Sequence, residues 1–445
     1  MLPRDRTAAR SAPPALAPGE LRTLAVAEWR ADPAGYQARW TAYLHEAALR
    51  YYLYDSTVAG DPYLGFDALV LDRAAWQRLV EATELLGQVF QRAVRAVQRD
   101  RPTLERLGFP WPVAEMLVHE PAAPWLSPIG RFDFLLDSHG EWRLLEYNCD
   151  TPSGVRETSG AERLLARLLD PRGAYRRLGS RLAARLRAAF AHLLQTAPRP
   201  VRRLGLVTDA GYAEDLAQLL FLREVLRDLG PELVLGDIDN LVVRRGRVYL
   251  LGRPVEALYR LYPIERLYGQ PVFPGLLDAA LAGRVLLLNP IAALLAQDKA
   301  LLAWIWAHRQ SGLFTPAQQR AIARHLPETY LITEVPAELD RRAFVVKEFF
   351  GREGEEVYLG EALDAADWER CRAWRTFVVQ RLVESQQVET VFWRGARLEP
   401  VRCIPCVGSY LAAGRWAGVY VRLGDRITTN RAQHVAAFVA REPAP

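Results

Sequence analysis

Two short segments could form a hairpin that carries metal-binding side chains. Residues 131–137 (RFDFLLD) begin by alternating polar and apolar side chains, as a half-buried strand does, and residues 142–148 (WRLLEYN) follow after a polar connection. If the central two residues of that connection, His139 and Gly140, form the turn, the register of the strands is fixed. Four polar side chains then lie on one face in two facing pairs, Asp133 with Glu146 and Arg131 with Asn148.

The facing carboxylates of Asp133 and Glu146 would repel each other in an ordinary sheet. A divalent cation would remove that conflict. Carboxylate and amide oxygens suit Mg²⁺ or Mn²⁺ better than zinc. We therefore predict that Asp133, Glu146 and Asn148 are metal ligands. The alternative is a structural salt-bridge cluster in which Arg131 neutralises the carboxylates.

Lysine is very rare in this chain. Of the 57 basic residues only two are lysines, Lys299 and Lys347, and the other 55 are arginines. Lysine offers a phosphate a compact point charge, which the broad guanidinium of arginine does not. Lys347 also lies in an otherwise apolar strand, where it must pair, lose its charge or point into a cleft. We predict that both lysines contact phosphates. The alternative is that these two positions kept lysine by chance.

A glycine-containing loop follows Lys347. The segment 351–356 (GREGEE) lies between two strand-like segments, and a loop in that position can cover phosphates with its backbone N–H groups. It lacks the P-loop and GxGxxG patterns, so a plain hairpin turn is the alternative. The residues proposed to contact a nucleotide here are Gly351, Arg352 and Gly354, together with Gln380 in a later strand that could lie against an adenine.

The elements that must position these residues alternate between helical and strand-like patterns. Residues 21–106 are mainly helical in pattern, and residues 113–148 form a strand-rich block. Helical patterns return at 161–169 and 175–195. Residues 1–20 are rich in proline, alanine and arginine, and we expect a disordered leader there.

The second half of the chain predicts an α/β module and further strands. A strand at 203–209, a helix at 213–229 and a strand at 232–235 are typical of a doubly wound unit. The strands expected next are 248–251, 257–262 and 284–288. A helix is expected at 291–310, with later strands at 343–350, 376–382, 406–412 and 417–423. The last two form a hairpin that ends at Arg422. The expected fold class is therefore α/β, with N-terminal helices.

Composition excludes several classes of protein. The chain has 445 residues, half of them apolar, which is enough for two or three domains. No apolar stretch is long enough for a membrane span, and the N-terminus lacks the apolar core of a secretory signal, so we expect a cytoplasmic protein. The basic residues are spread along the chain, which does not favour nucleic-acid binding. Four cysteines, including Cys403 and Cys406, are too few for a disulfide framework.

At these motifs the chain resembles the glutathionylspermidine synthase family, a branch of the circularly permuted ATP-grasp ligases. The resemblance runs in order over roughly residues 110–437. It rests on Arg131–Phe134, Leu145–Pro152, Asn289-Pro290 with Lys299, the Lys347 strand with Gly351–Gly354, Gln380, Gly408–Tyr410 and Gly418–Arg422.

The resemblance implies an ATP-grasp-type fold. It places N-terminal helices and the metal hairpin in residues 21–198, a substrate-binding α/β module in 199–295, and the nucleotide-binding lid with the rest of the core in 296–445. Mg²⁺ would be held by Asp133, Glu146 and Asn148. The two lysines would contact ATP phosphates, and Arg131 and Arg422 would steady the transferring phosphoryl group.

The implied reaction joins a carboxylate, of glutathione or a peptide, to an amine such as a polyamine through an acyl-phosphate. A polyamine pocket would need carboxylates, and the candidates are Asp150, Glu157, Glu214 and Asp215. Two alternatives stay open. One is a different acceptor on the same scaffold, and the other is a nucleotide-binding protein that acts through a partner without ligase turnover.

Overall fold

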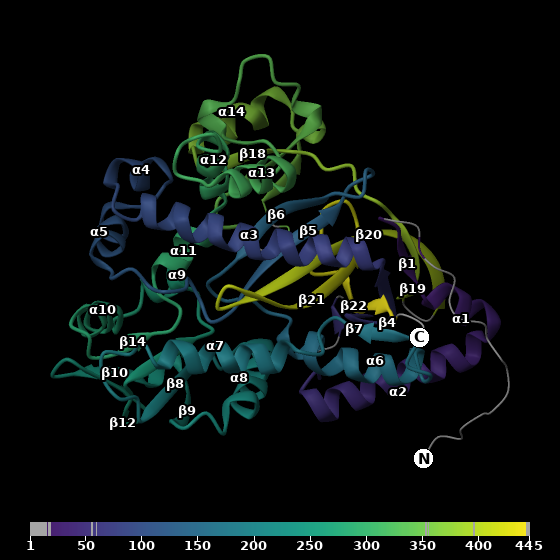
Figure 1. Ribbon diagram of the computed structural model, residues 1–445, viewed down its shortest axis with the longest axis horizontal. Coiled ribbons are helices and arrows are strands. Elements are labelled where there is room, and N and C mark those ends of the chain that lie inside the picture. Colours follow the sequence, from purple (N-terminus) through teal and green to yellow (C-terminus); the bar gives the residue numbers. More distant parts are fainter. Residues whose placement is uncertain are drawn as a thin grey trace.

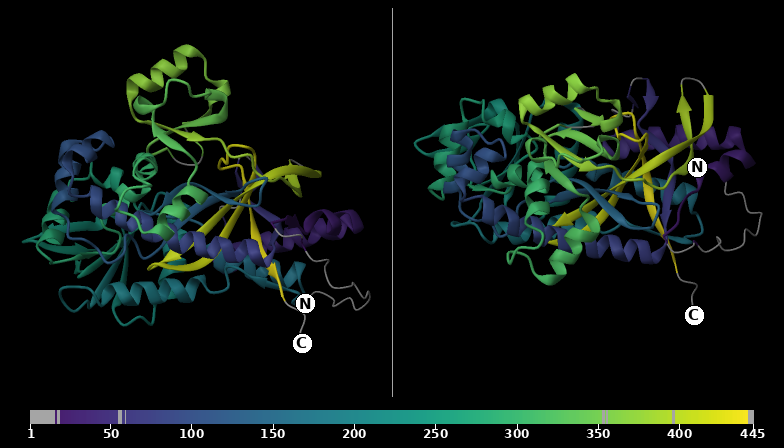
Figure 2. Two further views of the ribbon diagram at one scale, coloured as in Figure 1. Left: turned by 45° about the horizontal axis from the view of Figure 1, so that its top comes forward. Right: turned by 90° about the horizontal axis from the view of Figure 1, so that it is seen from above.

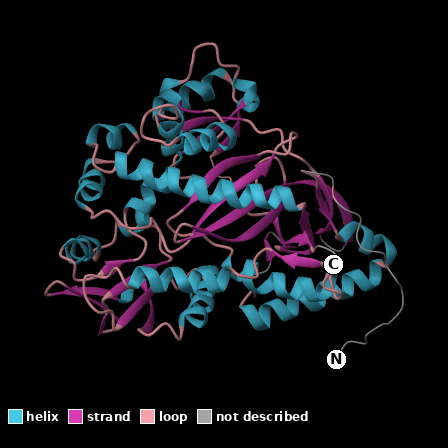
Figure 3. Ribbon diagram, viewed as in Figure 1, coloured by secondary structure: helices cyan, strands magenta, loops and turns pink. Residues whose placement is uncertain are grey.

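A large mixed β-sheet forms the centre of the molecule, and helices cover both of its faces (Figures 1 and 3). The computed structural model describes residues 16, 19–54, 57–58, 60–351, 354, 356–394 and 397–441. Most of the expected leader, residues 1–20, lies outside this part of the chain, as does Arg352. No helix among the described residues is long and apolar enough to cross a membrane.

The large sheet brings together strands from both ends of the chain. Its order is β1 (Leu21–Thr23), β4 (Leu64–Leu71), β22 (Gln433–Ala440), β21 (Arg415–Gly424), β20 (Arg397–Ala412), β5 (Gly130–Leu136) and β6 (Trp142–Asn148). Two further strands join it, with β19 (Val388–Arg394) pairing with β20 and β7 (Tyr175–Arg177) pairing with β22. The β4–β22 pair is parallel. The predicted hairpin at β20 and β21 is confirmed.

Alternation along the strands decides which helix covers which face. In β4, Leu69 and Leu71 belong to the core cluster shared with α3 (Arg73–Val97), which crosses one face of the sheet. Ala68 and Val70 point the other way and pack with α2 (Pro33–Tyr51). The second face also receives α6 (Glu162–Leu169) and α7 (Leu182–Leu194). Strands β20, β21 and β22 therefore have a helix on each face.

The α/β module has a parallel sheet, as predicted. Its order is β14 (Leu286–Leu287), β13 (Ala257–Arg260), β8 (Arg203–Thr208) and β9 (Glu232–Asp237). Chain order reverses between β8 and β13, which is the topology of a doubly wound sheet. Leu204 and Leu206 of β8 pack with α7 and α8 (Ala213–Leu226), whereas Val207 faces the opposite side.

That opposite side is covered by a small sheet and a helix. The small sheet is antiparallel and consists of β10 (Leu241–Arg244), β11 (Arg247–Leu250) and β12 (Arg253–Pro254). Helix α10 (Phe273–Leu281) contacts β10 and β11. The short elements elsewhere are α1 (Ala25–Ala31), α4 (Arg101–Arg106), α9 (Ile264–Leu267), β2 (Thr57–Val58) and β3 (Asp61–Pro62).

A second antiparallel sheet stands above the large sheet (Figure 2, left). Its order is β15 (Thr329–Leu331), β18 (Phe377–Arg381), β16 (Phe344–Glu348) and β17 (Val357–Leu359). Helix α14 (Ala365–Trp374) packs on it, and α12 (Lys299–Ala307) contacts β15 and β18. Helix α13 (Pro316–His325) contacts α3 and β6, below this upper sheet.

Three sequence predictions were wrong in detail. Residues 113–119, expected in a strand-rich block, belong to helix α5 (Trp111–His119), which has proline in its first turn, where a missing N–H costs nothing. The expected helix 175–195 starts as strand β7. The expected helix 291–310 is broken into α11 (Ala292–Gln297) and α12 because Asp298 leaves the helical conformation and caps Ala300 N at 2.8 Å.

Candidate functional site

The hairpin of β5 and β6 has the predicted register where its polar residues lie. Asp133 faces Glu146, and Arg131 faces Asn148. The predicted two-residue turn is wrong, because Asp137 N donates to Glu141 O at 2.9 Å and three residues form the turn. The register shifts by one residue beside Asp133, which offsets that error and restores the predicted pairing.

The side chains of the hairpin contact one another and two arginines. Asn148 Nδ2 donates to Asp133 Oδ2 and to Glu146 Oε1, both at 3.2 Å. Arg131 binds Asp133 through two nitrogens, at 2.7 and 3.0 Å. Arg422 Nη2 donates to Asp133 Oδ2 at 3.0 Å. The salt-bridge cluster and the proposed metal ligands therefore occupy the same place.

The donor set fits a hard divalent cation bound together with phosphate oxygens. Among the described residues no group of three or more His, Cys, Asp or Glu could hold a metal, so the amide of Asn148 would have to supply the third protein ligand. A rotation of that amide turns its oxygen toward the carboxylates. Mg²⁺ commonly takes one or two carboxylates and completes its shell with water and phosphate oxygens. Asp133 Oδ2 already accepts from Arg131, Arg422 and Asn148, whereas Oδ1 accepts from Arg131 Nε and, among the described residues, keeps a lone pair that a cation could use.

The two lysines reach the hairpin from different elements. Lys299, in the first turn of α12, places Nζ 3.4 Å from Glu146 Oε2 and donates to Gly351 O at 2.7 Å. Lys347, in β16, donates to Gln380 Oε1 at 2.7 Å and to Leu145 O at 3.4 Å. In this structure protein oxygens therefore hold both ammonium groups beside the carboxylates.

The electrostatic environment shifts the pKa values of Glu146 and Lys347. Burial raises the pKa of Glu146, but the charges of Lys299, Lys347 and Arg422 outweigh it and hold that pKa at about 2. Burial lowers the pKa of Lys347 to about 8, although the Glu146 charge works in the opposite direction. At neutral pH the Glu146 carboxylate is ionised and Lys347 keeps its proton.

The predicted site residues line one cavity. It has a volume of about 380 Å³ and lies between the upper sheet and the large sheet. Every predicted site residue in the described part of the chain lines it: Arg131, Asp133, Glu146, Asn148, Lys299, Lys347, Gly351, Gly354, Gln380 and Arg422. Gly354 has φ +77°, and a Cβ there would come 2.8 Å from Thr428 O, so this loop position requires glycine.

Sequence reasoning missed other residues that line the cavity. Tyr420 lies two residues before Arg422 on the same face of β21, and its ring lies 5.0 Å from the guanidinium carbon of Arg131 and 5.9 Å from that of Arg422. The alternation of the strand could have identified it. Gln297 also lines the cavity, and its type and spacing gave no signal beyond its closeness to Lys299.

The family is identified by a match that covers most of the chain. The sequence model for "Glutathionylspermidine synthase preATP-grasp" matches residues 33–440. The chain belongs to this family. It is 28% identical over 238 residues to a Haemophilus influenzae protein named "Putative acid--amine ligase". That alignment covers 52% of this chain and 55% of the relative, about half the length of each.

A solved structure has the same fold. A glutathione synthetase-like effector from Globodera pallida, in its apo form, superposes with a TM-score of 0.56 at 10% identity, over 83% of this chain and 89% of that one. A Methylobacillus flagellatus protein named "Putative gamma-glutamylcysteine synthetase" superposes less well, with a TM-score of 0.45 at 12% identity over 80% of this chain and 88% of that one. The fold of this family member is of the ATP-grasp type, as the sequence predicted.

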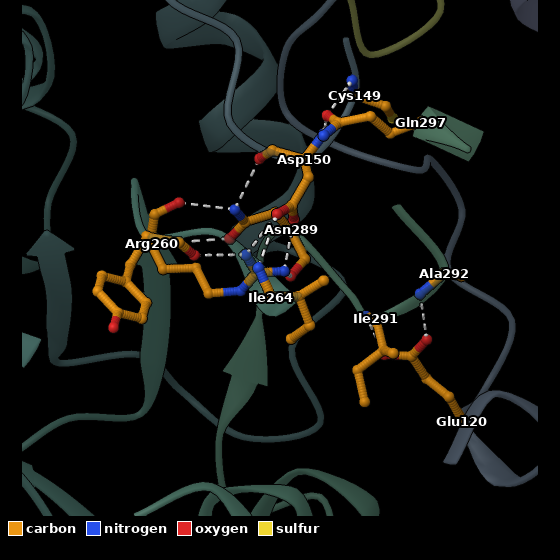
Figure 4. A network of polar contacts seen from close by, with 10 residues as sticks. Glu120, Cys149, Asp150, Arg260, Ile264, Asn289, Ile291, Ala292 and Gln297 are labelled. Carbon is orange, nitrogen blue, oxygen red and sulfur yellow. Dashed lines mark hydrogen bonds and ion pairs between the residues drawn. The ribbon is translucent and has the colours of Figure 1, made fainter. Parts of the chain in front are cut away.

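The four carboxylates suggested for amine binding have different surroundings. Asp150 is fully buried and pairs with Arg260, 2.5 Å away (Figure 4), so it is not available to a ligand. Glu157 is also fully buried, with Arg156 at 3.8 Å. Glu214, in the first turn of α8, lines the cavity, and Asp215 follows it. Glu214 is therefore the candidate of the four that the structure places at the cavity.

Proposed function

We propose that the chain is an ATP- and Mg²⁺-dependent ligase that joins a carboxylate to an amine. Its support is the single cavity in which two carboxylates, an amide, two lysines and two arginines converge. In the proposed reaction the γ-phosphoryl group of ATP passes to the substrate carboxylate and gives an acyl-phosphate and ADP. The amine then attacks the acyl carbon, the amide forms, and phosphate leaves as the nitrogen loses a proton.

The residues divide into three proposed roles. Asp133, Glu146 and Asn148 would hold Mg²⁺, which supplies positive charge to the phosphates when it is bound. Lys299 and Lys347 would exchange their present protein acceptors for phosphate oxygens. The loop residues Gly351, Arg352 and Gly354 and the strand residue Gln380 are proposed to contact the nucleotide. Of these, Arg352 lies outside the described residues.

The arginines are proposed to act on the transferring group. Arg131 and Arg422 both bond to Asp133 and lie against the ring of Tyr420, so their planes are fixed next to the proposed metal ligands. Fixed donors stabilise developing charge without having to reorganise during the reaction. Phosphoryl transfer needs this positioning and neutralisation more than a covalent catalyst.

The proposed substrates follow from the family and from a carboxylate, Glu214, that lines the cavity. The family description and the name of the Haemophilus influenzae relative support an acid and an amine as the reactants. We propose the carboxylate of glutathione or of another peptide, and a cationic amine such as a polyamine. Glu214 would pair with a cationic nitrogen of that amine.

The function is tested by ADP release from purified protein with Mg²⁺-ATP, glutathione and a panel of amines that includes spermidine. We expect ADP release that depends on both the carboxylate and the amine, with the amide detected by mass spectrometry. Lys347→Met, which removes one proposed phosphate contact, should lose the activity. Nucleotide binding without turnover for any pair would favour the alternative of a non-catalytic nucleotide-binding protein.

The pKa of Lys347 predicts that nucleotide affinity falls in alkaline solution. Phosphate selects the ammonium form, and above its pKa of about 8 the free protein loses that form. The dissociation constant for a Mg²⁺-bound, non-hydrolysable ATP analogue should rise about tenfold per pH unit above about pH 8.5, with uptake of one proton. Calorimetry in two buffers of different ionisation enthalpy measures both quantities.

The matched control for the pH profile is Lys347→Met. This variant should bind the analogue more weakly at pH 7.5, with little further change at higher pH because the titrating group is gone. A wild-type dissociation constant that stays constant up to about pH 9.5 would show that Lys347 does not set the affinity.

A further inference from the structure

Gln297 lies between the end of β6, which carries two of the proposed metal ligands, and α12, which begins with Lys299. It is the last residue of α11, and Asp298 separates it from Lys299. Its side chain reaches the residues that follow Asn148, at the end of β6 (Figure 4). The next segment is also anchored, because Lys299 N donates to Phe349 O, just after β16, at 3.2 Å. Gln297 therefore lies where three site elements meet.

Two backbone donors fix the orientation of the Gln297 amide. Its Oε1 accepts from Cys149 N at 3.2 Å and from Asp150 N at 3.1 Å. If the amide were turned over, its NH₂ group would face two N–H donors and all three groups would lose their partners. The amide oxygen is therefore occupied by the protein.

Several hydrogen bonds hold the end of β6, to which Gln297 bonds. Asp150 accepts from Arg260 at 2.9 and 2.5 Å and from Ile264 N at 3.1 Å, and its carbonyl accepts from Asn289 Nδ2 at 3.0 Å. These groups are buried, so the two N–H donors have little freedom to move away from Gln297. The direction of the remaining amide nitrogen is set by that frame.

The amide nitrogen is what Gln297 can offer to a ligand. Within the described part of the chain, Nε2 has no hydrogen-bond partner, and Gln297 lines the same cavity as Asn148 and Lys299. A neutral donor beside the ammonium of Lys299 suits an anionic oxygen. We infer that Gln297 is a ligand-binding residue whose NH₂ group donates to an anionic oxygen held between Asn148 and Lys299.

This inference rests on the proposed function, which supplies two sources for that oxygen. It belongs either to the phosphate chain of the nucleotide or to the carboxylate of the second substrate. The chemistry of recognition is the same for both: an oriented N–H donor next to a lysine and a metal site. Binding of each probe on its own separates the two sources.

Two substitutions distinguish the role of the NH₂ donor of Gln297 from that of its Oε1 acceptor. Gln297→Glu keeps an oxygen for Cys149 N and Asp150 N but removes the NH₂ donor and adds a negative charge. Gln297→Met removes both the donor and the acceptor and adds no charge. Wild type and both variants are titrated calorimetrically with a Mg²⁺-bound, non-hydrolysable ATP analogue and, separately, with glutathione. Thermal unfolding of each protein is recorded without ligand.

For one of the two probes we expect about tenfold weaker binding by Gln297→Met and a larger loss in Gln297→Glu. The melting temperature should stay at the wild-type value in Gln297→Glu and fall by about 2 °C in Gln297→Met, which leaves two N–H groups unpaired. The weakened probe identifies the source of the oxygen.

The inference is overturned if Gln297→Met binds both probes within about twofold of wild type, even if Gln297→Glu does not, because the glutamate effect would then be repulsion alone. This result is distinct from failure of the proposed function. In that case wild type itself would not bind the nucleotide analogue, and both claims would fall together.

Discussion

Replacement of Glu146 by glutamine is expected to lower the rate of ADP release by about 10²- to 10³-fold at saturating ATP. Glutamine has the same shape and can still accept from Asn148, so the change removes charge and little else. That charge faces Lys299 at 3.4 Å and is one of the two carboxylates proposed to hold Mg²⁺. Binding of Mn²⁺, followed by electron paramagnetic resonance without nucleotide, should weaken in parallel.

The loss of this charge also affects the lysines. Burial lowers the pKa of Lys347, and the Glu146 carboxylate is the largest influence that raises it. In Glu146→Gln the pKa of Lys347 should therefore fall below about 8, and the alkaline loss of nucleotide affinity should begin at a lower pH. A structural salt-bridge cluster without metal would show this change in pH profile but no change in Mn²⁺ binding.

The matched control is Glu141→Gln on the same hairpin. Glu141 lies in the connection between β5 and β6 and pairs with Arg324 at 2.6 and 2.7 Å, outside the residues that line the cavity. We expect its ADP release to stay within about twofold of wild type, because a partly exposed ion pair contributes little to the site. If both variants lose activity equally, the effect arises from damage to the hairpin and not from loss of a metal ligand.

The sequence could predict the features of the site that depend on local patterns. Period-2 alternation placed Asp133 and Glu146 on one face, and the opposed carboxylates indicated that something must neutralise them. The rarity of lysine singled out Lys299 and Lys347, and the structure brings both ammonium groups to the same cavity. The roles of these residues stay predictions, because their positions alone do not show what they bind.

The correct register of the hairpin depended on two deviations that cancelled. Asp137 Oδ1 accepts from His139 N and Glu141 N, at 2.9 and 2.8 Å, and this draws Asp137 into a three-residue turn. Without the shift beside Asp133, that turn would have placed Asp133 opposite Leu145 and separated the carboxylates. Turn type and bulges depend on side-chain contacts that alternation does not encode.

Pairing between residues far apart in the chain could not be predicted from the sequence. Asp150 was a candidate for binding an amine because a polyamine pocket would need carboxylates. The structure instead pairs it with Arg260, which is 110 positions away in the chain. Among 55 arginines nothing marked Arg260 as its partner. In the same way, the pairing of β4 with β22 depends on the packing of the whole sheet.

Replacement of Arg260 by methionine is expected to destabilise the protein by about 3–5 kcal/mol. Asp150 is fully buried and, among the described residues, would keep only Ile264 N as a donor to its carboxylate, so a nearly unpaired charge would remain in the interior. The free energy of unfolding is measured with urea. The double variant Asp150→Leu with Arg260→Met should recover part of the loss, since it leaves no buried charge behind.

A comparison with an exposed ion pair tests this reasoning. Arg253 pairs with Glu232 on the surface of the same α/β module, and both side chains are about half exposed. Arg253→Met should change the free energy of unfolding by less than about 1 kcal/mol. Equal effects of Arg253→Met and Arg260→Met would show that burial of the Asp150–Arg260 pair does not determine its contribution.

The pair should also affect the site, because it holds the end of β6, which carries two of the proposed metal ligands, Glu146 and Asn148. Asp150 lies two residues after Asn148, and Arg260 ties it to β13 of the α/β module, while Gln297 ties it to the end of α11, just before Lys299 (Figure 4). Release of Arg260 lets this strand end shift and leaves Asn148 less well placed. At a temperature where Arg260→Met is still folded, Mn²⁺ binding should therefore be several-fold weaker, whereas a pair that only stabilises the fold would leave it unchanged.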